Sequence, residues 1–378
     1  MSRNGSVRSA VITLYGALLL LMVPFGLLCS GLVLLTEAMV RPATLTLCVL
    51  LATATAVPYG ALLLWLDRNE REPWWLLLGA FLWGATVATT YASVVNSLTA
   101  FVGGWVFQDE ALGNMAMASV SAPISEEITK GMAVVGLLLL FRRELDNVLD
   151  GLVYGAVVGL GFAWFENITY YLMVANEGYI EVFFNAFGRG VLNGLSGHPT
   201  FTALTGLAVG LIRVQRRGKT RWLWLPLGLG LAMFSHFVWN TFAGLFFVSE
   251  DSLVANHLVS WPLAVVFLQL PFVLLLALVL WFVWRHEDAI IVGSLLGEPD
   301  DVVKEGEAEA LVPARKRAGR RWALIQRHGW AAYRKQRKLE RLQIDLAFAR
   351  WHHGEEGQGS LADDPTLQRL RSRIRALR

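Results

Sequence analysis

The chain has 378 residues, of which 55% are hydrophobic and only 17% are charged, and it carries 15 Trp residues. Soluble domains contain about 25% charged residues, so this composition excludes an ordinary soluble globular protein and indicates a membrane protein. The net charge of +3 is unevenly distributed, because 19 of the 33 Lys and Arg residues lie from Arg285 onward. Cys29 and Cys48 lie within apolar runs, where packing is a commoner role for cysteine than a disulfide or a metal site.

Eight apolar stretches are long enough to cross a hydrocarbon core of about 30 Å, which takes about 20 helical residues. The first follows Arg3 and Arg8 and is too long for the apolar region of a cleavable signal peptide, so we expect a retained first helix. The expected spans are residues 11–35, 43–66, 74–102, 114–141, 151–175, 190–212, 222–248 and 258–284. The predicted fold is an all-α, polytopic membrane bundle of about eight transmembrane helices.

Lys and Arg gather in alternate loops, as the positive-inside rule predicts for cytoplasmic segments. They precede the first span and follow the second, fourth and sixth, at Arg3, Arg8, Arg68, Arg71, Arg142, Arg143, Arg213, Arg216, Arg217, Lys219 and Arg221. The intervening loops hold only Arg41 and Arg189. This alternation predicts that both termini lie in the cytoplasm, an N-in/C-in arrangement.

The polar residues after the last span predict a second part of the chain. We expect a transmembrane domain over residues 1–285 and a basic cytoplasmic tail over 286–378 that is partly helical or disordered. Within the tail, residues 313–351 predict a basic helix that includes Trp322 and Trp330. Such a helix is typical of contact with anionic lipid headgroups, and a solvated helix or a disordered tail is the alternative. Topology and lipid explain these basic residues better than DNA does, so we expect no nucleic-acid partner.

Ionisable residues occur in four of the spans, where they are costly to bury and commonly functional. The polar residues of these four spans are Glu126, Glu127 and Lys130 in the fourth, Glu166 and Tyr170 in the fifth, His198 in the sixth, and His236 and Asn240 in the seventh. Each set lies about 14–15 residues, or roughly 21–23 Å, from the predicted cytoplasmic end of its span. Because alternate spans run in opposite directions, this agreement predicts that four helices meet around one polar site.

These residue types suit the activation of water for hydrolysis. A buried glutamate suits a general base, two histidines suit the holding of a water molecule, and Asn240 suits the stabilisation of an oxyanion. Lys130 lies one helical turn after Glu126, so we expect it to be a structural counter-ion, and Tyr170 lies one turn after Glu166. The sequence contains no Ser/His/Asp set, no pair of Asp residues in two spans and no H-E-x-x-H, which argues against serine, aspartyl and zincin-type proteases.

The four polar segments resemble the four sequence boxes of the PrsW family of intramembrane proteases. Glu126-Glu127-x-x-Lys130 is similar to the EExxK box, and DGLVYGAVVGLGFAWFENITY, residues 150–170, is similar to the second box. The His198 segment and His236-x-x-x-Asn240 are similar to the remaining two. The resemblance covers about residues 50–285, and four boxes in order on separate spans are a specific signal. The family is related to the CAAX-protease-like and Rce1-type endopeptidases.

The resemblance implies an endopeptidase that hydrolyses a peptide bond of a membrane-associated protein, in regulated intramembrane or site-1-type proteolysis. The implied catalytic residues are Glu126, Glu127, Glu166, His198, His236 and Asn240, supported by Lys130 and Tyr170. We prefer a glutamate-activated water without a cofactor, with Glu127 or Glu126 as the base. The alternative is zinc or another divalent metal held by His198, His236 and Glu127. The resemblance also implies a multi-pass protein of the bacterial inner membrane and, as the namesake's substrate, an anti-sigma factor.

Two other functions would also place ionisable residues inside a membrane. A proton-coupled transporter uses buried Glu, Lys and His, but the two halves of this chain show no inverted repeat. A non-catalytic membrane scaffold would not need every candidate catalytic group to be present. Both are kept as alternatives to the protease.

Overall fold

The structure is a computed structural model that describes residues 3–215, 218–247, 252–356 and 364–378. Arg216 and Arg217 of the predicted charge pattern and residues 357–363 of the predicted tail lie outside the described residues. Every regular element within the described ranges is a helix, which confirms the predicted all-α class. The chain divides into two compact units, Met1–Asp67 with Glu72–Ala277 and Arg68–Arg71 with Leu278–Arg378.

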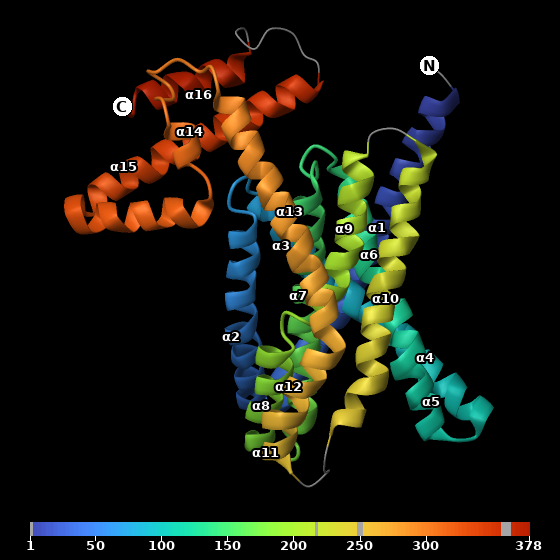
Figure 1. Cartoon of the computed structure of the whole chain (residues 1–378). Coiled ribbons are helices and arrows are strands. Elements are labelled where there is room, and N and C mark those ends of the chain that lie inside the picture. Colours follow the sequence, from blue (N-terminus) through green and yellow to red (C-terminus); the bar gives the residue numbers. More distant parts are fainter. Residues whose placement is uncertain (1–2, 216–217, 248–251, 357–363) are drawn as a thin grey trace. The chain divides into compact units, whose positions relative to one another are not determined.

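The first unit is a bundle of helices (Figure 1). Short π-helical or 3₁₀ segments interrupt or extend several of them. Its first half contains α1 (Arg3–Val40), α2 (Pro42–Leu66), α3 (Trp74–Leu82), η1 (Trp83–Ala88), α4 (Thr89–Phe107), α5 (Glu110–Ala116), η2 (Met117–Ser121) and α6 (Ala122–Leu140). Its second half contains α7 (Val148–Val174), α8 (Tyr179–Asn185), η3 (Ala186–Leu192), α9 (His198–Val214), η4 (Lys219–Leu223), α10 (Trp224–Phe242), η5 (Ala243–Phe246), α11 (Leu253–Ala255), η6 (Asn256–Ser260), α12 (Trp261–Ala264) and η7 (Val265–Gln269). The last helix, α13 (Leu270–Leu295), continues into the second unit.

Six helical stretches of the described chain are long and apolar enough to cross a membrane, whereas eight were expected. They are Ser9–Val40, Pro42–Leu66, Trp74–Phe107, Val148–Val174, Lys219–Phe246 and Leu253–Leu295. The two expected spans outside this set are those at 114–141 and 190–212. The first ends in α6, which carries three ionisable residues, and the second contains α9, which has only 17 residues. Both helices carry residues of the predicted site. The ionisable site residues lower the mean hydropathy of α6, and α9 is short because it begins at the site residue His198.

Helix α7 lies inside the bundle, as its many glycines predict, and 89% of its most apolar stretch is buried. Its packing against α9 is close enough to exclude side chains. A Cβ atom added at Gly159 would lie 2.2 Å from the carbonyl oxygen of His198, and one at Gly155 would lie 2.5 Å from that of Thr202. Since real Cβ atoms do not approach an oxygen so closely, these glycines let the two helices pack backbone to backbone and hold His198 against α7.

The predicted continuous span over residues 190–212 is wrong. The chain leaves η3 at Leu192, passes through turns at 193–197, and starts α9 at His198. Pro199 occupies the first turn of α9, where a missing N–H breaks no helical hydrogen bond. Pro123 likewise lies in the first turn of α6. Pro199 thus lies at the start of a helix beside His198, whereas Pro123 lies where the π-helical segment η2 continues directly into α6.

The second unit has a hydrophobic core of its own, formed by α13 beyond residue 277, α14 (Glu307–Ala310), α15 (Ala314–Glu356) and α16 (Pro365–Arg375). Ile291, Leu295, Val302, Leu346 and Ile374 are among its buried residues. The core also encloses charges with partners. Arg317 donates to the carbonyl oxygen of Leu311 and to Asn69 Oδ1, both at 2.8 Å, and burial lowers the pKa of its guanidinium to about 10. Residues 278–356 and 364–378 therefore include a packed helical unit rather than a set of isolated helices.

Candidate active site

A cavity of about 480 Å³ opens inside the first unit among α4, α6, α7, α9 and α10. Its wall includes most of the predicted site residues, namely Glu126, Glu166, Tyr170, His198, His236 and Asn240, together with Asn96 and Arg189. Phe162, Phe201 and Trp239 supply an apolar part of the same wall. A concave pocket with a few convergent polar groups is the usual form of a ligand or substrate site.

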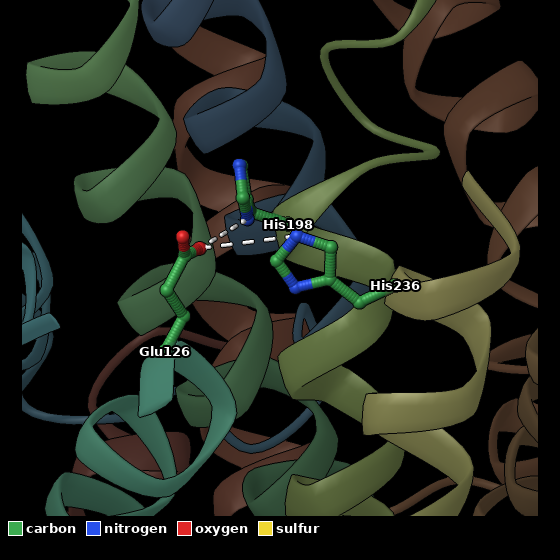
Figure 2. Close-up of side chains that lie close together, drawn as sticks. All are labelled: Glu126, His198 and His236. Atoms are coloured by element: carbon green, nitrogen blue, oxygen red, sulfur yellow. Dashed lines mark ion pairs between the residues drawn. The ribbon is translucent and has the colours of Figure 1, made fainter. Parts of the chain in front are cut away.

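Glu126, His198 and His236 form the centre of the polar wall, and they come from three different helices, α6, α9 and α10 (Figure 2). Figure 2 shows the Glu126 carboxylate directed toward both imidazole rings. Glu126 Oε2 lies 3.8 Å from His198 Nδ1 and 3.9 Å from His236 Nε2. This oxygen is buried and accepts no hydrogen bond. Its nearest cation is the Lys130 ammonium at 3.6 Å, which is beyond hydrogen-bond distance. Because a buried carboxylate oxygen without a hydrogen bond is costly, this atom is a candidate ligand for a metal ion or a water molecule.

The other nitrogen of each histidine is bound by a second carboxylate. His198 Nε2 lies 2.8 Å from Glu166 Oε2, and His236 Nδ1 lies 3.1 Å from Glu127 Oε1. Each contact requires the imidazole to carry its proton on the outer nitrogen, so in the neutral rings His198 Nδ1 and His236 Nε2 carry no proton and act as acceptors. The two carboxylates therefore set the tautomer of the rings and aim both lone pairs at the region of Glu126 Oε2.

Lys130 and Glu127 are a fully buried ion pair, with no exposed side-chain surface on either residue. Lys130 Nζ lies 2.6 Å from Glu127 Oε1 and 3.6 Å from Glu126 Oε2. It also donates to His198 Nδ1 at 3.0 Å and lies 4.1 Å from the centre of the Phe162 ring. Thr202 donates to the second oxygen of Glu127 at 3.1 Å. Glu127 therefore faces the interior of the bundle, where its partners come from α6, α9 and α10, and it does not line the cavity.

Asn240 holds His236 from the cavity side. Its Nδ2 atom lies 3.2 Å from His236 Nε2 and donates to the carbonyl oxygen of Ala118 at 2.9 Å. The His236 ring also stacks on Phe201, with 4.8 Å between ring centres. These contacts fix the position of the ring, and they leave Asn240 in the cavity wall, where its amide also suits the predicted stabilisation of an oxyanion.

Glu126 is positioned by Asn96, a residue of α4 that the sequence analysis did not single out. Asn96 Nδ2 donates to Glu126 Oε1 at 3.3 Å. Ser121 and Ser125 donate to Asn96 Oδ1 at 3.1 and 2.8 Å, which orients the amide. The carboxylate thus has one oxygen held by an amide and the other free toward the histidines.

Arg189 is the second residue that the sequence analysis did not assign to the site, because it was counted only as a loop charge. Its Nη2 atom donates to Glu166 Oε2 at 2.6 Å, and its Nε atom donates to Asn167 Oδ1 at 3.2 Å. The guanidinium lies 3.6 Å from the centre of the Tyr170 ring. Tyr170 therefore supports Arg189 rather than contacting Glu166 directly. The only signal in the sequence was that Arg189 is the single Lys or Arg between the fifth and sixth expected spans.

The donor set fits a divalent metal of the zinc type. Glu126 Oε2, His198 Nδ1 and His236 Nε2 all lie within 4.8 Å of one another. Ligand atoms of tetrahedral zinc lie roughly 3.4 Å apart. The two distances from Glu126 Oε2 to the histidines, 3.8 and 3.9 Å, would therefore need to close by about 0.5 Å. Histidines that bind a metal commonly give their other nitrogen to a carboxylate, as both do here. The third ligand by this geometry is Glu126, in place of the Glu127 expected from the sequence.

Comparison with known proteins points to one family. A family profile described as "PrsW family intramembrane metalloprotease" matches residues 72–278. The "Protease PrsW" of Geobacillus kaustophilus (strain HTA426) is 29% identical over 173 residues, which are 46% of this chain and 70% of that protein. The "Protease PrsW" of Bacillus subtilis (strain 168) is 28% identical over 171 residues, 45% of this chain and 70% of that protein. No solved structure matches the chain.

The matched region contains all of the cavity residues named above and comprises more than half of the 378 residues. Its helices are long and apolar enough for several membrane crossings, in agreement with the membrane location that the family description states. The chain is a multi-pass membrane protein and belongs to the PrsW family of intramembrane proteases.

Proposed function

We propose that the chain hydrolyses a peptide bond of a membrane-associated protein inside the 480 Å³ cavity, at the centre formed by Glu126, His198 and His236. The observation that carries the proposal is the free Glu126 Oε2 atom facing two imidazole nitrogens whose outer positions are already held by carboxylates. Contacts between α6, α7, α9 and α10 hold these side chains in place before a substrate binds. Catalysis of hydrolysis depends on such fixed positions of the reacting groups.

Glu126, His198 and His236 would hold a divalent metal in this proposal. The ligand set, one carboxylate and two imidazoles, suits zinc and leaves a coordination position for water or the substrate carbonyl. A bound zinc ion supplies a lowered pKa for its water and polarisation of the scissile carbonyl. We prefer this assignment to a metal-free mechanism, because metal-bound histidines commonly give their other nitrogen to a carboxylate, as both histidines do here.

The other residues of the wall handle the proton and the substrate. Glu166 contacts His198 and Arg189 through Oε2, which leaves Oε1 as an acceptor for the proton of the attacking water. That proton then passes to the departing amine nitrogen of the cleaved bond. Asn240 would donate to the oxygen of the tetrahedral intermediate with the N–H group that His236 Nε2 releases when it binds the metal.

A metal-free mechanism is the second candidate, and a specific contact favours it. Lys130 Nζ and Asn240 Nδ2 donate to the same two nitrogens that would bind the metal. In this mechanism Glu126 accepts the proton of the water, and the buried ammonium of Lys130 supplies the positive charge near the reacting carbonyl.

Metal content and cleavage together test both mechanisms. The full chain would be purified in detergent as wild type, Glu126→Gln and His236→Ala, assayed for bound metal, and incubated with candidate single-span membrane proteins. Bound zinc in the wild type, its loss in both variants, and cleavage that a chelator abolishes and zinc restores would support the metal mechanism. Cleavage by a metal-free wild type that chelators leave unchanged would support the second candidate. If single-span substrates are left intact while the protein moves protons across a vesicle membrane, the transporter alternative applies.

Location and substrate follow from the family and the charge pattern. We propose that the protein lies in the inner membrane of a bacterium with both termini in the cytoplasm, because Lys and Arg alternate between loops. A membrane-anchored anti-sigma factor is the proposed substrate type, by analogy with the family's namesake.

A further inference from the structure

The beginning of α15 carries an unusual density of positive charge. Residues 314–339 contain ten Lys and Arg residues and no Asp or Glu. Eight of these ten side chains are exposed, and one of the eight, Lys335, donates to the main-chain oxygen of Arg378. The other seven form the surface that we call the basic surface of α15: Arg315, Lys316, Arg320, Arg327, Arg334, Arg337 and Lys338. This surface lies outside the residues that match the PrsW family, so the family's activity does not account for it.

The charges of the basic surface have no ion-pair partner among the described residues of the folded unit. Other cations of α15 do have partners within the unit. Arg317 is buried and bound by Asn69, and Arg321 forms an ion pair with Glu340 at 2.5 Å. By contrast, none of the seven side chains of the basic surface forms an ion pair with any residue that the structure describes. Unpaired like charges in one segment repel one another, so they favour an anionic partner.

Two exposed tryptophans lie among these cations. Trp322 is 61% exposed and Trp330 is 64% exposed, and the Trp330 ring contacts Tyr333 with 5.4 Å between ring centres. Gly329, with φ 74° and ψ −177°, divides α15 into two helices, and the Arg321–Glu340 pair joins them. Each of the two helices therefore presents one large indole and several cations to the surroundings.

We propose that the basic surface of α15 binds the surface of an anionic phospholipid bilayer. Indole side chains prefer the headgroup region of a bilayer, and cations near an anionic membrane surface are attracted to it. The order of the segments along the chain also keeps the basic surface of α15 near a membrane. Helix α15 begins shortly after the long apolar stretch Leu253–Leu295 ends, so the basic surface is tethered to a membrane-crossing segment.

The full chain in lipid nanodiscs tests the proposal without knowledge of a protease substrate. Cys29 and Cys48 would be replaced by serine and alanine, and an environment-sensitive dye would be attached to Ala331→Cys, at an exposed position beside Trp330. The dye emission should shift to shorter wavelength in discs of phosphatidylcholine mixed with phosphatidylglycerol, and not in discs of phosphatidylcholine alone. Raising the salt from about 0.1 M to about 1 M shortens the Debye length from about 10 Å to about 3 Å, and should remove the shift.

A charge-reversed variant and a matched control locate the effect. Arg327→Glu combined with Arg334→Glu and Arg337→Glu should abolish the shift in anionic discs. Arg369→Glu with Arg373→Glu changes exposed arginines of α16 in the same unit and should leave it intact. Equal emission in both kinds of disc, or a shift that survives the triple reversal, would overturn the proposal. A response only to added RNA or DNA in neutral discs would replace lipid by nucleic acid as the partner.

Discussion

Glu126 and Glu127 are neighbours in α6, yet only Glu126 lines the cavity. The Glu127 side chain is fully buried, with its carboxylate 2.6 Å from the Lys130 ammonium. One helical step rotates a side chain by about 100°, so the two adjacent carboxylates leave the helix in different directions although both lie near Lys130. The first carboxylate is thereby available for chemistry, and the second neutralises a buried lysine and orients His236.

Replacement of the two glutamates should have different consequences. Glu126→Gln should lower cleavage by about 100-fold or more while leaving the protein folded, because the reacting carboxylate is lost and few contacts change. Glu127→Gln should lower the free energy of unfolding by about 3 kcal/mol, because it leaves the Lys130 charge without its closest partner. Denaturant unfolding in detergent and a cleavage assay measure the two effects, with exposed Glu110→Gln as the control. A stable but inactive Glu127→Gln protein would instead make Glu127 the reacting group.

Asn96 should act on catalysis through Glu126. In Asn96→Ala, Glu126 Oε1 loses its amide donor, and the carboxylate gains rotational freedom. Loss of such an orienting contact typically lowers activity or metal affinity by about 10- to 100-fold. The measurement is kcat/KM for cleavage together with bound metal, and Ser97→Ala, at another position in the cavity wall, should change neither. Equal effects of the two substitutions would remove the special role of Asn96.

Arg189 should be needed as an arginine and not only as a positive charge. Its guanidinium binds Glu166 and Asn167 and stacks on Tyr170, and a lysine cannot make all three contacts. Arg189→Lys and Arg189→Gln should both lower kcat/KM, with the larger loss in Arg189→Gln, and both should alter its pH profile through Glu166. Arg41→Gln, which removes the other arginine of the intervening loops, should leave the pH profile unchanged. A normal pH profile in both Arg189 variants would make Arg189 structural only.

Stability should fall as the pH rises, owing to a carboxyl group between α2 and α3. Burial, and next the nearby Asp150, raise the pKa of Glu72 from its ordinary value to about 11. The group is then neutral in the folded protein at pH 7 and ionised in the unfolded chain, so the unfolded state binds fewer protons and stability declines above about pH 4. Glu72→Gln stays neutral and keeps an oxygen acceptor for the Tyr154 hydroxyl. The melting temperature between pH 6 and 9 should therefore depend less on pH in Glu72→Gln than in wild type or Glu110→Gln, and equal slopes would contradict this.

Much of the site could be predicted from the sequence because its residues are anomalous where they occur. Glu166, His198 and His236 lie in apolar helices. Because an ionisable side chain is costly to bury there, each of them is expected to be functional. Similar depth then implied that they meet, and the structure brings His198 within 2.8 Å of Glu166 and places Glu126 between the two histidines (Figure 2). Asn96 and Arg189 were not found, because an amide or an arginine near a helix end is ordinary by itself.

The sequence by itself determined the all-α membrane architecture, the family and the helices that carry the polar residues. These properties follow from local composition, since apolar length and buried charge can be read along one helix at a time. Only the tertiary structure decided which of Glu126 and Glu127 faces the cavity and that Arg189 reaches Glu166 across 23 positions of the chain. It also decided that the expected span at 190–212 is broken before His198. The physical reason is that helix rotation and side-chain reach depend on neighbouring helices, such as the backbone of α7 at Gly159, whose packing against α9 fixes where His198 lies.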